Sequence, residues 1–178
     1  MIGKTMTTRR HRRKRTPSRR VIPAAIVFVA GLALLTALGF IPGSRAATTE
    51  QVVTDRVSGL AILGFDPVAY FIEGAALPGK DGFEYTFAGA VWRFRNEGNR
   101  GAFILDPEFY MPRFGGHDPV AIARGVALPG DPRLWLLAGD RLYLFHAPDA
   151  KNAFARDPDA AIAAAGEKWP QLLRTLSP

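Results

Sequence analysis

The stretch from Asp118 to Phe145, DPVAIARGVALPGDPRLWLLAGDRLYLF, repeats a pattern already present from Asp66 to Phe94, DPVAYFIEGAALPGKDGFEYTFAGAVWRF. Each copy contains Asp-Pro-Val-Ala, then Ala-Leu-Pro-Gly, then an Ala-Gly step, and ends in a strand-like run of apolar and aromatic residues. An Ala-Phe pair and an Asp-Pro step follow both copies in the same order, the latter at Asp106 and Asp157. This shared order indicates an internal duplication.

The sequence of each copy predicts a β-hairpin followed by a short helix. Apolar residues alternate on both sides of a Gly-containing turn, which is typical of paired strands, and the next segment has helical spacing. We expect helices over residues 97–105, 149–156 and 158–176, the last broken at Pro170 because proline cannot donate a helical hydrogen bond. The aromatic residues of the hairpins are expected to form the core: Phe83, Tyr85, Phe87, Trp92, Phe94, Trp135, Tyr143 and Phe145.

The predicted fold class is α+β, with two tandem ββα modules that share one core and a hydrophobic N-terminal helix before them. The first module covers residues 63–116, and the second covers residues 117–178 with the C-terminal helix. Residues 47–62 are expected to be a tether. Residues 1–46 are expected to be a basic segment with a signal peptide or transmembrane anchor.

The positive charge of the chain is concentrated at its N-terminus. The formal net charge is +7, but nine of the 23 Lys and Arg residues lie between Lys4 and Arg20, and all 16 Asp and Glu residues lie from Glu50 onward. From Ala47 to the C-terminus the formal net charge is −3. Because non-specific nucleic-acid binding requires clustered cations, the charge distribution excludes a nucleic-acid partner for this part of the chain.

An uncharged apolar run of 21 residues, 21–41, follows the basic segment. As a helix it would extend about 31 Å, which is enough to cross the bilayer core. Ser44 and Ala46 are small residues at the positions that a signal peptidase reads, so one outcome is cleavage after Ala46. The length of the run favours the other outcome, an uncleaved membrane anchor. In both cases the basic flank stays inside, and we expect a periplasmic or other extracytoplasmic location for the rest of the chain.

The residues after the leader resemble the YHS-domain family in the form found in exported bacterial proteins. The resemblance rests on DPVAYF at residues 66–71, DPEFYMPRFGG at residues 106–116 and GDRLYLF at residues 139–145. It covers nearly all of the chain from Ala47 onward. The family implies a small binding module and largely lacks an assigned enzymatic activity.

The resemblance also implies a relation to metal-binding modules of the TRASH type. In these modules a Cys ligand directly follows an aromatic strand, and a second Cys lies four positions further on. The matching positions are Arg95 and Asn99 in the first copy, and His146 and Ala150 in the second. This chain contains no cysteine, which excludes thiolate coordination, disulfides and thiol catalysis.

Imidazole coordination stays open at two positions. His146 matches a ligand position of the related modules, and His117 and Asp118 stand where relatives often carry a Cys after the Gly-Gly step. We therefore predict a metal site of His117, His146 and Asp118, suited to copper, zinc or haem iron, with Tyr110 or Met111 approaching it.

The alternative is a domain without a cofactor, in which both histidines are structural and the hairpins present a face to a partner protein. Asp66 and Asp118 each precede a proline, where aspartate most simply starts a turn. The sequence contains no nucleophile elbow, no GxGxxG pattern and no P-loop, and we predict no catalytic residue. An enzyme is therefore the third interpretation.

The fate of the leader is directly measurable. If the signal is cleaved, N-terminal sequencing of the exported protein will find Ala47 as the first residue. An intact Met1 in the membrane fraction would identify an anchor instead. Recovery of the protein in the cytoplasmic fraction would contradict both outcomes.

Overall fold

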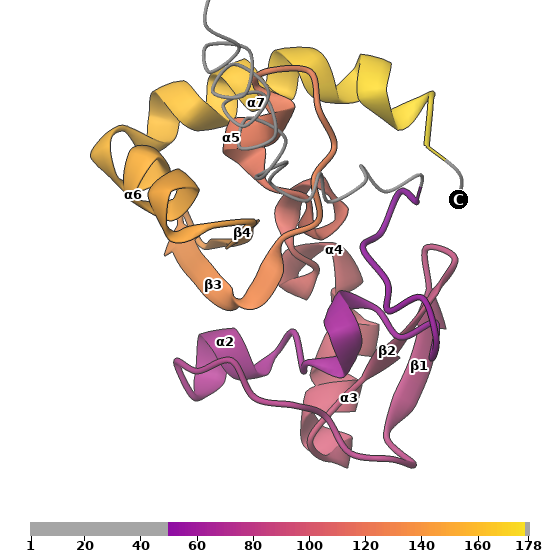
Figure 1. Cartoon of the computed structure of the whole chain (residues 1–178). Coiled ribbons are helices and arrows are strands. Elements are labelled where there is room, and N and C mark those ends of the chain that lie inside the picture. The colour runs from indigo at the N-terminus through magenta and orange to yellow at the C-terminus, as the bar shows by residue number, and fades with distance from the viewer. Residues whose placement is uncertain (1–49, 177–178) are drawn as a thin grey trace, which may run out of the picture. The chain divides into compact units, whose positions relative to one another are not determined.

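The computed structural model of the chain describes residues 50–176, which form helices and two small antiparallel sheets (Figure 1). The α+β class predicted from the sequence is confirmed. The predicted leader, with its hydrophobic helix, cleavage site and anchor, lies outside the described residues. Among residues 50–176, no helix is both long enough and apolar enough to span a bilayer.

Two antiparallel hairpins form as predicted. Their strands are β1 (Glu84–Phe87) with β2 (Ala90–Arg93), and β3 (Asp131–Ala138) with β4 (Arg141–Phe145). Both Ala-Gly steps lie at the hairpin turns, and the two turn residues of each hairpin have positive φ: 52° at Ala88, 77° at Gly89, 54° at Gly139 and 55° at Asp140. Two consecutive positive φ values are typical of type I′ turns, whose twist matches that of the paired strands.

A helix follows each hairpin and places one phenylalanine against it. α3 (Glu97–Leu105) follows the first hairpin, and Phe103 lies 5.1 Å from Trp92 and 5.2 Å from Phe94 between ring centroids. α6 (Pro148–Arg156) follows the second, and Phe154 lies 4.9 Å from Tyr143 between ring centroids. The observed bounds agree with the predicted helices to within one residue.

Short helical turns precede each hairpin. Before the first are η1 (Ile62–Gly64) and α2 (Ala69–Ile72); before the second are η2 (Arg113–Gly116) and α5 (Pro119–Ile122), and α4 (Pro107–Tyr110) lies between the two halves. The halves use matching backbone hydrogen bonds at this point. Asp66 N donates to Leu77 O and Asp118 N donates to Leu128 O, both at 2.9 Å.

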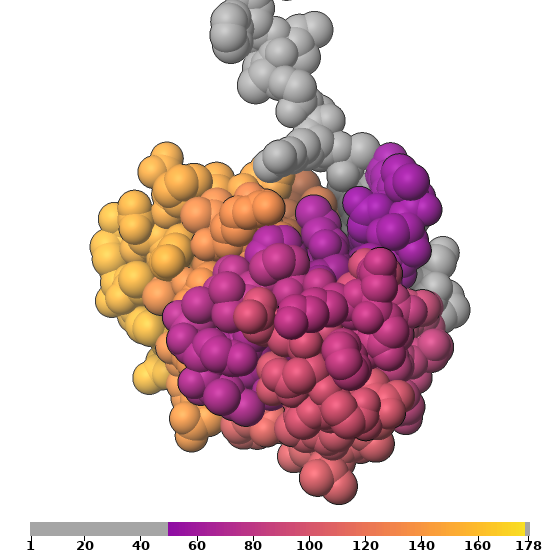
Figure 2. All heavy atoms as spheres, turned by 90° about the horizontal axis from the view of Figure 1, so that it is seen from below, coloured from indigo at the N-terminus to yellow at the C-terminus, as the bar shows by residue number. Residues whose placement is uncertain are grey.

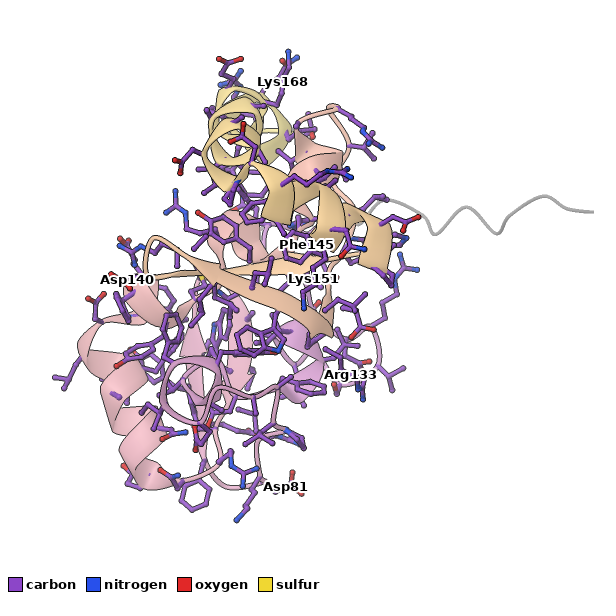
Figure 3. All side chains as sticks on the ribbon, turned by 90° about the vertical axis from the view of Figure 1, so that its left-hand side faces the viewer. Asp81, Arg133, Asp140, Phe145, Lys151 and Lys168 are labelled. Atoms are coloured by element: carbon purple, nitrogen blue, oxygen red, sulfur yellow. The ribbon has the colours of Figure 1, made fainter. Side chains whose placement is uncertain are left out.

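The buried side chains form two clusters, where the sequence predicted one shared core. β4 lies between them, because its alternate residues face opposite sides: Leu142 and Leu144 join the first cluster, whereas Tyr143 and Phe145 join the second. Figure 3 shows the same order, with Asp81 of the first half at one end of the molecule, Phe145 in the middle and Lys168 at the other end. A strand buried on both faces therefore connects the two halves.

Tyr70 of the first half also contacts the second half. Its hydroxyl donates to Pro132 O at 2.9 Å, and its ring lies edge-on to Trp135 at 5.2 Å. Burial is the main cause that raises the pKa of Tyr70, so the hydroxyl stays protonated and can donate this bond. In the space-filling view of Figure 2, the two halves pack directly against each other.

The segment predicted as a tether is packed where the structure describes it. Val52 and Val53 are buried, and the Val53 backbone accepts a hydrogen bond from Ile62 N and donates one to Gly115 O, both at 2.8 Å. Burying two valines stabilises this position by roughly 1.5–3 kcal/mol for each side chain. Residues 50–62 are therefore part of the folded domain.

The predicted break at Pro170 is wrong. α7 (Pro158–Leu173) continues through Pro170, and it ends three residues before the predicted Leu176. Proline in a helix removes one backbone hydrogen bond. Here Trp169 and Leu172, on either side of it, pack against the second cluster, and we attribute the continuity of the helix to this packing.

Gly115 provides a test of the packed segment. A Cβ added there would lie 1.9 Å from Gln51 O, whereas a Cβ at Gly125 would meet no atom within 4 Å, and both glycines have positive φ. Gly115→Ala is expected to lower the free energy of unfolding by about 2 kcal/mol more than Gly125→Ala, because only the first adds a steric overlap to the backbone strain. Urea denaturation measures the difference, and equal losses would contradict the packing of residues 50–53.

Candidate functional site

A buried aspartate organises the start of each hairpin. In the first half, the side chain of Asp66 is fully buried. Its Oδ1 accepts from Val68 N at 2.8 Å and from Ala69 N at 3.4 Å. Its Oδ2 accepts from Arg95 N at 2.8 Å and from the side-chain amide of Asn99 at 2.7 Å. Four donors therefore satisfy the carboxylate and connect the turn, the end of β2 and α3.

Asp118 takes the same position in the second half but has one donor fewer. Its Oδ1 accepts from Val120 N at 2.8 Å and Ala121 N at 3.3 Å, and its Oδ2 accepts from His146 N at 2.8 Å. In the first half the fourth donor is Asn99, four residues after the residue that donates its backbone N–H. The corresponding residue of the second half is Ala150, whose methyl side chain has no hydrogen-bond donor. Asp118 is only 1% exposed, so the spare capacity of its carboxylate lies inside the fold.

A cavity of about 400 Å³ lies beside this carboxylate, between α5 and α6. We call it the α5–α6 cavity. Its polar and charged lining consists of Asp118, Arg124, His146, Asp149 and Arg156. Ala150, Ala153, Leu128 and Val120 contribute to its apolar wall.

His146 lines this region. Its Nδ1 lies 3.2 Å from Pro129 O. A carbonyl oxygen only accepts, so Nδ1 donates this bond, and in the tautomer with a proton on Nδ1 alone, Nε2 is an acceptor. The position that the family resemblance marks as a ligand therefore has two roles here. Its backbone N–H binds Asp118, and its ring lines the cavity.

Two arginines give the cavity positive charge. Arg124 and Arg156 are both exposed, and neither forms an ion pair with an acidic side chain among residues 50–176. Asp149 is exposed in the first turn of α6. The cavity therefore combines donors and acceptors of opposite charge.

His117 lies elsewhere, although Asp118 follows it in the sequence. Its ring is fully buried and packs 5.6 Å from the Trp169 ring of α7, and it does not line the α5–α6 cavity. Nδ1 lies 2.8 Å from Phe114 O, and Nε2 is the one buried side-chain nitrogen or oxygen of the described residues without a hydrogen-bond partner. Burial lowers the pKa of His117, opposed by the Phe114 carbonyl and the charge of Glu50.

The structure therefore brings together two of the three predicted metal ligands, Asp118 and His146, and leaves His117 apart. Tyr110 and Met111 pack against the first hydrophobic cluster. Among residues 50–176, no three His, Cys, Asp or Glu side chains are grouped so that they could hold a metal ion. The residues present do not form the shared three-ligand site.

A larger hollow of about 540 Å³ is lined by residues of both clusters. Its apolar lining comes from four separate segments and includes Val52, Phe87, Met111, Phe114, Trp169 and Leu173. No sequence pattern predicts this hollow, because its four segments lie far apart in the chain. Arg124 and Arg156 of the α5–α6 cavity are also missed from the sequence, because no local pattern joins them and they meet only in the fold.

Comparisons of the chain with protein-family models, with curated proteins and with solved structures each found no match.

The burial of His117 predicts a pH dependence of stability. In the unfolded chain the pKa of His117 is near 6.5, and in the folded protein it is lower. As the pH falls, His117 therefore binds a proton in the unfolded state before it does so in the folded state. Stability is then fully present above about pH 6.5 and declines below it, by at most about 1.4 kcal/mol per pH unit, until the folded-state pKa is reached.

His117→Phe, which installs the residue found at the matching position 65, is expected to remove this decline. His146→Gln is expected to keep the decline in stability at low pH, because His146 donates its hydrogen bond to Asp118 from the backbone, which the substitution leaves in place. Urea denaturation between about pH 5.5 and pH 7.5 measures both variants. An unchanged slope in His117→Phe would contradict the assignment.

Proposed function

We propose that this chain is an exported or membrane-anchored protein of the YHS type, built from two duplicated ββα modules, and that it is a non-catalytic binding module. The second module is proposed to hold a small ligand in the α5–α6 cavity. The observation that carries the proposal is the difference between the two buried aspartates. The side-chain amide of Asn99 is the fourth donor to the Asp66 carboxylate. At the matching position beside Asp118 stands Ala150, which offers no side-chain donor, and both residues line the cavity.

The matched local geometry supports the duplication. Gly79 N donates to Gly64 O at 2.9 Å, and Gly130 N donates to Gly116 O at 3.0 Å. The last residue of each Ala-Leu-Pro-Gly motif therefore forms a backbone hydrogen bond to the glycine that ends the preceding helical turn. Each of these glycines also lies where a Cβ would come within 3 Å of a strand residue, 2.7 Å from Arg93 and 2.5 Å from Leu144. Such a close approach favours glycine at both positions.

The lining of the cavity suits the binding of a ligand. The carboxylate of Asp118 is fixed by three backbone donors, and none of the described residues on the cavity wall is a serine, threonine, lysine or tyrosine that could act as a nucleophile. His146 offers an acceptor, but no side chain that it could activate lines the same wall. A buried polar group beside a concave, mostly apolar wall is typical of a ligand site.

Copper, zinc or haem iron would meet a single imidazole in this cavity, that of His146. The unpaired guanidinium groups of Arg124 and Arg156 also oppose a bare cation there, because like charges repel; both arginines are exposed, so water and salt screen this repulsion in part. We therefore propose a metal-free small molecule as the ligand. Metal ions and haem belong in the test as competing ligands.

One observation favours the second candidate, a cofactor-free interaction domain at the extracytoplasmic membrane face. Phe87, Trp169 and Leu173 are half-buried and line the larger hollow. Aromatic anchors of this kind are enriched in protein–protein interfaces. A partner that binds there would leave the α5–α6 cavity unaffected.

The test introduces the missing donor. The full chain, purified in mild detergent, is heated with a panel of small polar molecules and with copper, zinc and haem. At about 100 times its Kd, a ligand adds roughly 2.7 kcal/mol to the free energy of unfolding. At least one metal-free compound is expected to stabilise the wild type but not Ala150→Asn, in which the new amide occupies the cavity as Asn99 does in the first half.

Ala155→Asn is the matched control, since it makes the same change on an exposed part of α6. Ala153→Leu fills the cavity with an apolar side chain and covers the case in which Ala150→Asn does not fold. Stabilisation by a metal or haem alone would replace this proposal with the metal-binding one. No stabilisation by any compound, or equal stabilisation of all variants, would overturn the cavity as the site.

A further inference from the structure

The charges around the α5–α6 cavity are separated along the two helices that form it. Asp118 is the N-cap of α5, and Asp149 lies in the first turn of α6. Arg156 is the last residue of α6, and Arg124 lies just beyond the end of α5. The hydrogen bond from His146 N to Asp118 brings the starts of both helices together, so the acceptors lie where the helices begin and the arginines where they end.

Each simple class of ligand would meet a repulsive group in this arrangement. An amine without an acid would approach Asp118 favourably but meet Arg124 and Arg156. A dicarboxylate would pair with the arginines but meet the carboxylates of Asp118 and Asp149. Such mismatched charges discriminate against a ligand, because a like charge beside it makes binding less favourable, most of all next to the buried carboxylate of Asp118.

We infer that the α5–α6 cavity binds a zwitterionic amino acid or a molecule of that class, with its ammonium group toward Asp118 and His146 and its carboxylate toward Arg124 and Arg156. This inference rests on the proposed ligand-binding function of the same cavity. The ammonium supplies the donor that Asn99 supplies in the first half. The guanidinium groups supply the paired donors that carboxylates bind best.

The remaining wall suits an apolar side chain. Val120, Leu128 and Ala153 line the cavity together with Ala121 and Ala147. At about 400 Å³, the cavity falls at the low end of the range for small-molecule sites. L-Leucine therefore combines the required ammonium and carboxylate groups with an apolar side chain that this wall can contact.

The test uses calorimetric titration of the full chain in mild detergent with three matched probes. These are L-leucine, 4-methylpentanoate, which lacks the ammonium group, and 3-methylbutylamine, which lacks the carboxylate. L-Leucine is expected to bind at least roughly tenfold more tightly than either, since each truncation removes a charge-assisted contact.

The double variant Arg124→Gln, Arg156→Gln is expected to weaken the binding of L-leucine roughly tenfold and to strengthen the binding of 3-methylbutylamine, because it removes the carboxylate partners of the first and the like charges that repel the second. Arg174→Gln, an exposed arginine outside the cavity, is the control and should bind as the wild type does. Equal affinities for the three probes, or no binding of L-leucine, would overturn the inference. The proposed function would still stand if another metal-free compound stabilised the wild type and not Ala150→Asn, so the two failures are distinguishable.

Discussion

A carboxylate buried in a protein must be surrounded by donors, and this requirement shapes both halves of the domain. Asp66 and Asp118 each accept two backbone N–H groups from the turn that follows and one from a residue within two positions of the end of the second strand. These bonds fix the start of a short helix against the end of a hairpin. Because an unsatisfied buried charge is strongly unfavourable, the local framework depends on this arrangement more than on any single apolar contact.

The same constraint explains how two similar halves can serve different purposes. In the first half, Asn99 completes the set of donors and fills the space beside the carboxylate. In the second half, the fourth donor is absent and a cavity replaces it. The three backbone hydrogen bonds to Asp118 are kept there, and β4 is buried on both faces. A ligand would therefore meet a carboxylate that is already held in place, which lowers the entropic cost of binding.

Much of the fold is predictable from local patterns, and the rest is not. The hairpins and α3 follow from alternation, from the cap at Asn96 and from the stop at Asp106-Pro107, all of which act within a few residues. The continuity of α7 through Pro170 and the burial of Val53 depend on contacts with distant segments. The sequence predicts Asp118 and His146 as metal ligands, whereas in the structure the backbone N–H of His146 donates to Asp118. No sequence pattern predicts the cavity, because the missing fourth donor at Ala150 is visible only beside the contact of Asn99 with Asp66. His117 was marked by its position after Gly-Gly, yet its ring packs against Trp169, which no local pattern indicates.

The central claim is that the second carboxylate has a donor position open to a ligand, whereas the first does not. The backbone N–H groups of His146 and Arg95 report on the two carboxylates directly, because each donates to the Oδ2 concerned at 2.8 Å. The most direct measurement is the amide proton chemical shift of both residues by NMR during titration of the isotope-labelled protein with a stabilising compound. The account predicts a saturable shift at His146 and none at Arg95. Stabilisation accompanied by equal shifts at both amides, or by none at His146, would contradict it.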